Sequence, residues 1–276
     1  MGIIKKGEDL AKILGVDVDK LPGEVQEFLL GQVTKKLDDE KSDRAAFKAE
    51  LEGYSDEDLL VFVPDVYQKS IYKIDYGKLK ENGIKLISFD IDDTITDSAW
   101  NKVRGSIPSV KVTMPDDAKE LFRNLKSMGF TVTLLTNTKA SIAKDVCEEL
   151  QADGYIARAS KPETRNFEKM MELYQVEPSQ MAHVGNNMRD DVVGGNRAGV
   201  TTCLIRRAGV SLKVAKFAMK TAGLRTKGHL IRERLLERGI WRKHHKSVKG
   251  DQYCQRQFEI VRKRRRNIVV FRRGEG

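Results

Sequence analysis

The sequence predicts an α/β fold in which helices cover both faces of a parallel sheet. Between residues 85 and 205, short apolar runs rich in branched side chains alternate with segments of helical periodicity. Strands and helices that alternate at this spacing are typical of parallel sheets, because each helix carries the chain back across one face. Several predicted strands also end in polar residues, as in sheets that bind ligands beyond the carboxyl ends of their strands.

The individual elements follow from the apolar runs and from the residues that flank them. The helix predicted over 116–128 has Pro115 near its start and Gly129 past its end, which are favoured positions for these residues. Residues 61–84 mix aromatic and β-branched side chains and are expected to pack against the sheet. The other predicted helices cover 140–152, 163–174 and a short stretch before the last strand, and the predicted strands cover 85–90, 130–135, 154–157, 181–184 and 200–205.

The apolar strand 85–90 leads directly into a concentration of carboxylates and hydroxyls. Asp90, Asp92 and Asp93 are followed at once by Thr94. Carboxylates this close repel one another, and burying one without a partner costs several kcal/mol. A positive group is therefore expected nearby, which favours metal or phosphate chemistry over the alternative, a plain helix cap.

Further polar groups follow the later strands. Thr136-Asn137 comes after the second strand, Lys161 shortly after the third, and residues 186–191 after the fourth. Because the carboxyl ends of parallel strands lie at one edge of a sheet, these side chains are expected to share one site with Asp90. Taken singly, each has an ordinary alternative: helix caps for the threonine and the aspartates, and a solvated loop charge for the lysine.

In four motifs that occur in order, the chain resembles the haloacid dehalogenase superfamily of phosphotransferases. The motifs are Asp90-Ile-Asp-Asp-Thr94, Thr136-Asn137, Lys161-Pro162 and Gly185-Asn-Asn-Met-Arg-Asp-Asp191. The resemblance implies a Rossmann-like sheet and an enzyme, a phosphatase that hydrolyses phosphoric monoesters.

The same resemblance implies catalytic roles for residues of the first three motifs. Asp90 would be the nucleophile and form an aspartyl-phosphate, which suits a carboxylate because it is ionised at neutral pH. Asp92 would protonate the leaving oxygen and then activate water. Thr136 would donate its hydroxyl to the phosphoryl group, and Lys161 would balance charge between phosphate and carboxylates.

Contacts to substrate and metal are implied as well. Thr94 and Asn137 would contact the substrate. The expected cofactor is Mg²⁺, which favours hard oxygen ligands. Its implied ligands are Asp90, Asp92 (through the backbone carbonyl), Asn186, Asp190 and Asp191.

Asn186 stands where the family usually has an acidic residue. An amide oxygen can bind magnesium but brings no charge, so the metal affinity should fall unless Asp190 and Asp191 compensate. Two functions therefore stay open. One is a Mg-dependent phosphomonoester hydrolase; the other is a catalytically weak relative that acts as an adaptor for nucleic acid or an anionic membrane.

The segments between the motifs leave no room for a folded cap over the site. They span only about 40 and about 25 residues, enough for the helices and strands already predicted there. An open site suits a bulky or polyanionic substrate, such as a lipid phosphate or a nucleic-acid end. Over 62–207 the chain resembles the capless subfamily IIIA phosphatases of the YqeG type, in Val63-Pro-Asp-Val-Tyr67 and Gly194-Gly-Asn-Arg-Ala-Gly199.

Three regions are expected: an acidic helical appendage (1–61), the catalytic α/β domain (62–207) and a basic extension (208–276). Residues 206–276 hold 22 Lys and Arg against 5 Asp and Glu, whereas the residues before them hold 28 against 35. The basic extension favours nucleic acid or an anionic membrane surface as a partner. The alternative is a charged helical extension packed on the acidic body.

Finer features of the terminal regions follow from spacing. Helices are predicted over 22–37, 45–51, 211–222 and 230–236, and Ser55 with Asp58 has the pattern of a capping box. The adjacent His244 and His245 lack a third ligand and are expected to be solvated rather than to bind metal.

The sequence favours a cytoplasmic protein. It has no apolar run of about 18 residues or more, and its N-terminus lacks the apolar centre of a signal peptide. Cys147, Cys203 and Cys254 are widely spaced and form no zinc pattern, which indicates free thiols in a reducing compartment.

Overall fold

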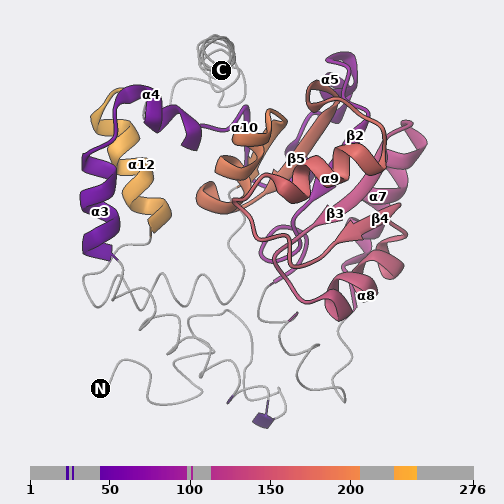
Figure 1. Cartoon of the computed structure of the whole chain (residues 1–276). Coiled ribbons are helices and arrows are strands. Elements are labelled where there is room, and N and C mark those ends of the chain that lie inside the picture. The colour runs from indigo at the N-terminus through magenta and orange to yellow at the C-terminus, as the bar shows by residue number, and fades with distance from the viewer. Residues whose placement is uncertain are drawn as a thin grey trace.

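A six-stranded sheet forms the centre of the protein (Figure 1). The structure is a computed structural model that describes residues 23–24, 27, 44–97, 101, 113–205 and 227–240. The strand order is β1-β6-β5-β2-β3-β4, and all neighbouring strands are parallel. The strands are β1 (Val66–Gln68), β2 (Leu86–Phe89), β3 (Thr131–Leu135), β4 (Gly154–Ile156), β5 (Met181–Gly185) and β6 (Thr201–Ile205). The predicted α/β fold with a parallel sheet is confirmed.

The lead-in segment contributes an edge strand, which the sequence does not predict. β1 pairs with β6, and residue 65 just before it fixes the register. The Asp65 backbone N–H donates to the Thr202 carbonyl oxygen at 2.9 Å, and the Thr202 N–H donates to Asp65 Oδ2 at 2.9 Å. With three residues, β1 is too short to produce a visible apolar alternation. The expectation that 61–84 packs against the sheet is confirmed.

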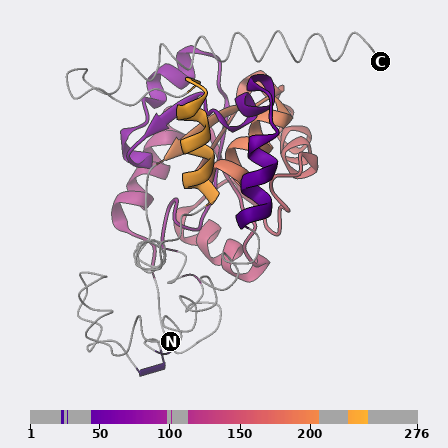
Figure 2. The same ribbon diagram turned by 90° about the vertical axis from the view of Figure 1, so that its left-hand side faces the viewer.

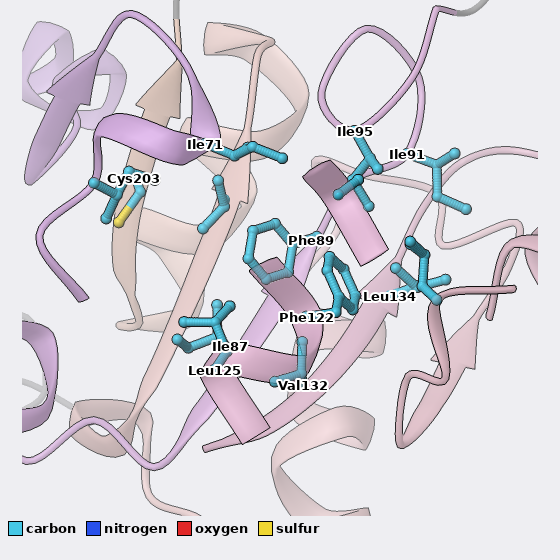
Figure 3. Packing of buried hydrophobic residues seen from close by; sticks show 14 of the residues in the cluster. Ile71, Ile87, Phe89, Ile91, Ile95, Phe122, Leu125, Val132, Leu134 and Cys203 are labelled. Carbon is cyan, nitrogen blue, oxygen red and sulfur yellow. The ribbon is translucent and has the colours of Figure 1, made fainter. Parts of the chain in front are cut away.

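Side chains alternate along the strands and give the sheet two apolar faces. Ile87 and Phe89 of β2 belong to the larger core, where the Phe89 and Phe122 ring centroids lie 5.0 Å apart (Figure 3). Leu86, which points to the opposite face of the sheet, belongs to a second cluster that includes Phe167. The first face is covered by α5 (Tyr76–Glu81), α7 (Asp116–Ser127) and α8 (Ala140–Leu150), and the second by α9 (Arg165–Leu173) and α10 (Val193–Ala198). Helices thus cover both faces, as predicted.

The short helix expected before the last strand begins as a π-helical turn, η5 (Met188–Val192), and continues as α10. Asn187 caps the turn, because its Oδ1 accepts the backbone N–H of Arg189 at 2.9 Å and that of Asp190 at 3.3 Å. Such turns are often found at functional sites. Here the turn carries the last of the polar motifs.

Helices from the two terminal regions lie side by side (Figures 1 and 2). They are α3 (Arg44–Glu52) and α4 (Asp56–Leu59) before the sheet and α12 (Lys227–Glu237) after it. The predicted helices over 45–51 and 230–236 and the capping box of Ser55 with Asp58 are confirmed. Apolar side chains of these helices form a separate core with the turn η5, including Phe47, Leu51, Ile231, Leu235, Met188 and Val192.

Charged contacts join the described part of the basic extension to the acidic N-terminal helices. Arg238 Nε lies 2.6 Å from Asp56 Oδ1, and Arg234 Nη2 donates to the Glu52 carbonyl oxygen at 3.0 Å. For 227–240, the structure therefore agrees with the alternative of a charged helix packed on the acidic body.

Other expectations for the terminal regions cannot be compared with the structure. Helix 22–37 apart from residues 23–24 and 27, helix 211–222, His244, His245 and Cys254 lie outside the described residues. Cys147 and Cys203 are free thiols, as expected. No helix in the described ranges has both the length and the apolar character that a bilayer crossing requires.

The packing of α12 predicts the cost of one substitution. Ile231 is completely buried in the core shared with α3 and η5. Ile231→Ala is expected to lower the free energy of unfolding by ~2–5 kcal/mol, because it removes buried methyl groups and leaves a cavity. Urea unfolding followed by circular dichroism measures this cost.

The matched control is Glu237→Ala on the same helix. Glu237 is exposed and lies 3.5 Å from Arg234, so its loss should change the free energy by less than ~1 kcal/mol. Equal, small effects of both substitutions would show that α12 is not part of the folded core.

Candidate active site

The polar motifs meet at the carboxyl edge of the sheet, where the strand order reverses. β2 lies between β5 and β3, the connection from β2 to β3 runs over one face, and that from β5 to β6 runs over the other. Asp90 directly follows β2, Thr136 follows β3 and Asn186 follows β5. This is the place where open parallel sheets bind ligands. Lys161 enters from the segment after β4.

A tight turn after β2 presents the first motif. Ile91 and Ile95 are completely buried in the main core and anchor the turn from below (Figure 3). Asp93 adopts a left-handed backbone conformation with a φ of 57°, and its N–H donates to the Thr96 carbonyl oxygen at 2.7 Å. Thr94, expected to contact substrate, is completely buried within this turn.

Lys161 joins two carboxylates from different motifs. Its Nζ lies 2.8 Å from Asp90 Oδ1 and 2.5 Å from Asp191 Oδ1, and it donates to the Leu135 carbonyl oxygen at 3.0 Å. Its side chain is 2% exposed. Burial opposes the charged form, but Asp191 and Asp90 outweigh it and raise the pKa of Lys161, so the ammonium stays charged.

Asp191 is buried and has partners within the protein on both carboxylate oxygens. Its Oδ1 accepts from Lys161 and lies 3.1 Å from His183 Nε2, while its Oδ2 accepts the Asn187 N–H at 2.9 Å. Burial alone would raise its pKa, but Lys161 and His183 hold the pKa of Asp191 well below the usual value. Both oxygens are engaged within the protein, unlike the expectation for a metal ligand.

Gly185 makes the close approach of Asp191 feasible. A Cβ atom at this position would overlap the Asp191 carboxyl group. Glycine is therefore required here for space rather than for an unusual backbone conformation.

The carboxyl groups of Asp90 and Asp190 have raised pKa values, because the positive charge near them does not offset their burial and the neighbouring negative charges. Burial, with the charges of Asp191 and Asp92, raises the pKa of Asp90 to about 7 in spite of Lys161. Burial and the charge of Asp191 raise the pKa of Asp190 to about 6. A cation at this edge would favour the ionised form of both groups.

The ligands expected from the sequence would offer such a cation hard oxygens. Those that the contacts described above leave available are the carboxylates of Asp90 and Asp190, the Asn186 amide and the Asp92 backbone carbonyl. Within the described ranges, no three acidic, histidine or cysteine side chains converge as a metal cluster. A cation here would thus depend on amide and carbonyl oxygens and on water as well, which suits Mg²⁺.

Asp92 is oriented by two residues that the sequence does not single out. Asn101 Nδ2 donates to Asp92 Oδ1 at 2.7 Å, and Thr138 Oγ1 donates to Asp92 Oδ2 at 2.8 Å. Thr138 lies two positions after Thr136, and this closeness to the second motif is the sequence feature that could have indicated its role. Asn101 follows no recognisable pattern.

The second motif holds the third in place. Asn137 Oδ1 accepts the Lys161 N–H at 2.8 Å, and Asn137 Nδ2 donates to the Lys161 carbonyl oxygen at 3.2 Å. The Asn137 side chain, expected to contact substrate, is therefore bonded to the backbone of the lysine. Thr136 is buried at the end of β3, and its Oγ1 accepts the Thr138 N–H at 3.3 Å.

Ser88 and His183 are also absent from the sequence-based prediction. They are partners in register on β2 and β5, and the Ser88 Oγ lies 2.8 Å from His183 Nδ1. A polar residue at matching positions of two otherwise apolar strands was the signal that could have indicated them.

Comparisons with known sequences find similar proteins. Residues 110–199 match the family model of haloacid dehalogenase-like hydrolases. The chain is 28% identical over 144 residues to "Probable phosphatase YqeG" of Bacillus subtilis (strain 168), which covers 52% of this chain and 77% of that protein.

Solved structures with similar folds include a putative haloacid dehalogenase superfamily (subfamily III A) hydrolase from Legionella pneumophila. The identity is 12% and the TM-score 0.37, over 58% of this chain and 93% of that one. Another is 3-deoxy-D-manno-octulosonate 8-phosphate phosphatase from Moraxella catarrhalis in complex with magnesium ion, phosphate ion and KDO molecule. Here the identity is 14% and the TM-score 0.35, over 52% of this chain and 91% of that one.

The family match covers the second, third and fourth motifs. The first motif lies before the matched region, directly after β2. The sequence relative is described as a probable phosphatase, and in this chain the ordered motifs gather at one edge of a parallel sheet. The comparisons thus bear out the resemblance to the haloacid dehalogenase-like hydrolases and to a probable phosphatase of the YqeG type.

Proposed function

We propose that the protein is a Mg²⁺-dependent phosphomonoester hydrolase that acts through an aspartyl-phosphate on Asp90. The observation that carries this proposal is the buried Lys161 ammonium, bonded to Asp90 and Asp191 at the carboxyl edge of the sheet. Among the described residues, Lys161 is the hydrogen-bond partner of the Asp90 carboxylate on Oδ1, which leaves Oδ2 for attack.

In the first step, an Asp90 carboxylate oxygen attacks phosphorus, and the bond between phosphorus and the leaving oxygen breaks. Asp92 gives its proton to the leaving oxygen, and Asn101 and Thr138 hold the Asp92 carboxyl group in orientation. In the second step, Asp92 takes a proton from water, the water oxygen attacks phosphorus, and Asp90 is released as a carboxylate. Lys161 offsets the negative charge of the phosphoryl group in both steps.

Mg²⁺ would be held by Asp90, Asn186, Asp190 and the backbone carbonyl of Asp92. When bound, it supplies positive charge to the phosphoryl oxygens and to the carboxylates. We assign Asp191 to the support of Lys161, because both of its oxygens are already engaged. Thr136 and Thr94 are proposed to contact the phosphoryl group, and Asn137 to hold the Lys161 backbone.

The substrate is proposed to be bulky or polyanionic, such as a lipid phosphate or a nucleic-acid end. Between β2 and β3 the described chain contains α7, and between β3 and Lys161 it contains α8 and β4. None of these described elements forms a separate domain that would close over the site.

Replacing the proposed nucleophile tests the reaction directly. Asp90→Asn is expected to reduce hydrolysis of p-nitrophenyl phosphate with Mg²⁺ by roughly a thousandfold or more, because an amide does not attack phosphorus. The control is Glu172→Gln, which neutralises an exposed carboxylate on α9 and should leave the rate unchanged. Equal rates for wild type and Asp90→Asn would rule out the proposed nucleophile.

A substitution at Asn186 tests the proposed metal site through an increase in Mg²⁺ affinity. Asn186→Asp adds a negative charge to the donor set, so the Mg²⁺ concentration for half-maximal activity should fall about tenfold, which corresponds to ~1.4 kcal/mol. Asn124→Asp, an exposed change of the same charge on α7, should leave this concentration as in the wild type. An unchanged Mg²⁺ requirement in Asn186→Asp would remove residue 186 from the metal site.

A second function, a catalytically weak adaptor for polyanions, is favoured by the neutral Asn186 and by the charge of 206–276. It predicts that a chain ending at residue 240, which keeps α12, loses salt-sensitive binding to RNA or to vesicles containing an anionic lipid. Fluorescence anisotropy and vesicle flotation measure this binding. Binding that persists in the shortened chain would exclude 241–276 as the contact.

A further inference from the structure

A chain of buried polar groups runs from the centre of the sheet to the proposed nucleophile. Ser88 Oγ lies 2.8 Å from His183 Nδ1, and His183 Nε2 lies 3.1 Å from Asp191 Oδ1. The same Asp191 oxygen lies 2.5 Å from Lys161 Nζ, which lies 2.8 Å from Asp90 Oδ1. Ser88 and His183 are at most 1% exposed, so their contacts are shielded from solvent.

Ser88 and His183 occupy positions where apolar residues would otherwise be expected. Their neighbours on β2 and β5, including Ile87, Phe89 and Val184, are completely buried. A buried hydroxyl or imidazole costs free energy unless it is hydrogen-bonded, and both groups here are satisfied by each other and by Asp191.

The surroundings fix the plane and the tautomer of the His183 ring. The Phe167 ring packs edge-on against it, with centroids 5.0 Å apart and an interplanar angle of 85°. Burial lowers the pKa of His183, which favours the neutral ring with a single N–H. A carboxylate oxygen can only accept, so a hydrogen bond between His183 and Asp191 places the proton on Nε2, and Nδ1 then accepts from the Ser88 hydroxyl.

The position of the Lys161 ammonium depends on its partners more than on its own backbone. Lys161 lies in an irregular segment after the three-residue strand β4, in which Arg158 and Ser160 adopt positive φ values. Its long side chain has several rotatable bonds. The Asp191 carboxylate therefore helps to determine where the ammonium lies, together with Asp90 and the Leu135 carbonyl oxygen. His183 contributes to the orientation of that carboxylate on Oδ1, and the Asn187 N–H does so on Oδ2.

We propose that His183 is a positioning residue for the phosphatase reaction. It orients Asp191, and through Asp191 it places the Lys161 ammonium against Asp90; Ser88 holds His183 in the required tautomer. This inference rests on the proposed reaction at Asp90, and it adds two residues that lie behind the site and do not touch the substrate.

Two substitutions at position 183 separate this role from simple filling of space. His183→Leu fills similar volume but provides no donor, whereas His183→Gln can place an N–H near the former Nε2. For p-nitrophenyl phosphate with Mg²⁺, His183→Leu is expected to lower kcat about 10- to 100-fold with a smaller change in KM. His183→Gln should recover most of that loss, and Ser88→Ala should give an intermediate kcat.

Thr133→Val is the matched control. Thr133 is the register partner of Ser88 on β3, completely buried, with no hydrogen bond on its hydroxyl among the described residues. Its replacement makes the same kind of change, polar to apolar in a buried strand, without touching the site. It should leave kcat at the wild-type value, and thermal unfolding of all variants confirms that each is folded.

The tautomer provides a readout that does not depend on activity. Spectra of the ¹⁵N-labelled histidine ring nitrogens should show the proton of His183 on Nε2 in the wild type, with His183→Gln used for assignment. In Ser88→Ala the ring should populate both tautomers.

A folded His183→Leu with wild-type kcat, equal loss in His183→Gln and His183→Leu, or a proton on Nδ1 would each overturn the proposal. If the wild type itself lacks activity, the proposed function fails, whereas the ring nitrogens still show whether Ser88 sets the tautomer.

Discussion

The buried ammonium of Lys161 is the interaction on which the rest of the site depends. It lies between Asp90, which follows β2, and Asp191, which belongs to the turn after β5. Loss of one partner from a buried ion pair commonly costs ~3–5 kcal/mol, because it leaves an uncompensated charge. The ion pairs therefore connect three separate segments. They also compensate the buried negative charges of Asp90 and Asp191, which would otherwise destabilise the folded state. The Asn137 amide and the Leu135 carbonyl oxygen fix the same lysine from its backbone and its side chain.

The sheet makes this arrangement available, and the terminal helices support it from one side. Because β2 and β5 are neighbours, Asp90 and the turn η5 emerge together at the point where the strand order reverses. α3 and α12 pack on η5 through one apolar core. The Arg189 guanidinium lies over the Phe47 ring of α3, with its central carbon 5.7 Å from the ring centroid. The helices α3 and α12, which fall outside the region that resembles the family, are thereby in contact with the motif that carries Asp190 and Asp191. We interpret these two helices as packed on the α/β domain rather than as independent of it.

Much of the fold and the composition of the site could be predicted from the sequence. Apolar runs of four or five residues separated by helical spacing predict β2, β3, β5 and β6, and the polar residues at their ends predict where the site lies.

β1 could not be predicted, because its three residues are too short for a pattern and its pairing depends on Asp65 bonding to Thr202. The direction of side chains could not be predicted either. Asp190 and Asp191 are adjacent in sequence, yet the turn η5 sends Asp191 inward to Lys161 and leaves Asp190 nearer the surface. Contacts of this kind, like those of Asn101 with Asp92, arise only when distant segments meet.

The central claim is that Asp90 carries the phosphoryl group during turnover. The most direct measurement is acid quenching of a single turnover with ³²P-labelled substrate, followed by proteolysis and localisation of the label by mass spectrometry. The account predicts a hydroxylamine-sensitive phosphoryl label on Asp90 that forms and decays at rates consistent with turnover. Phosphate release without any label on Asp90, or a label on another residue, would contradict it.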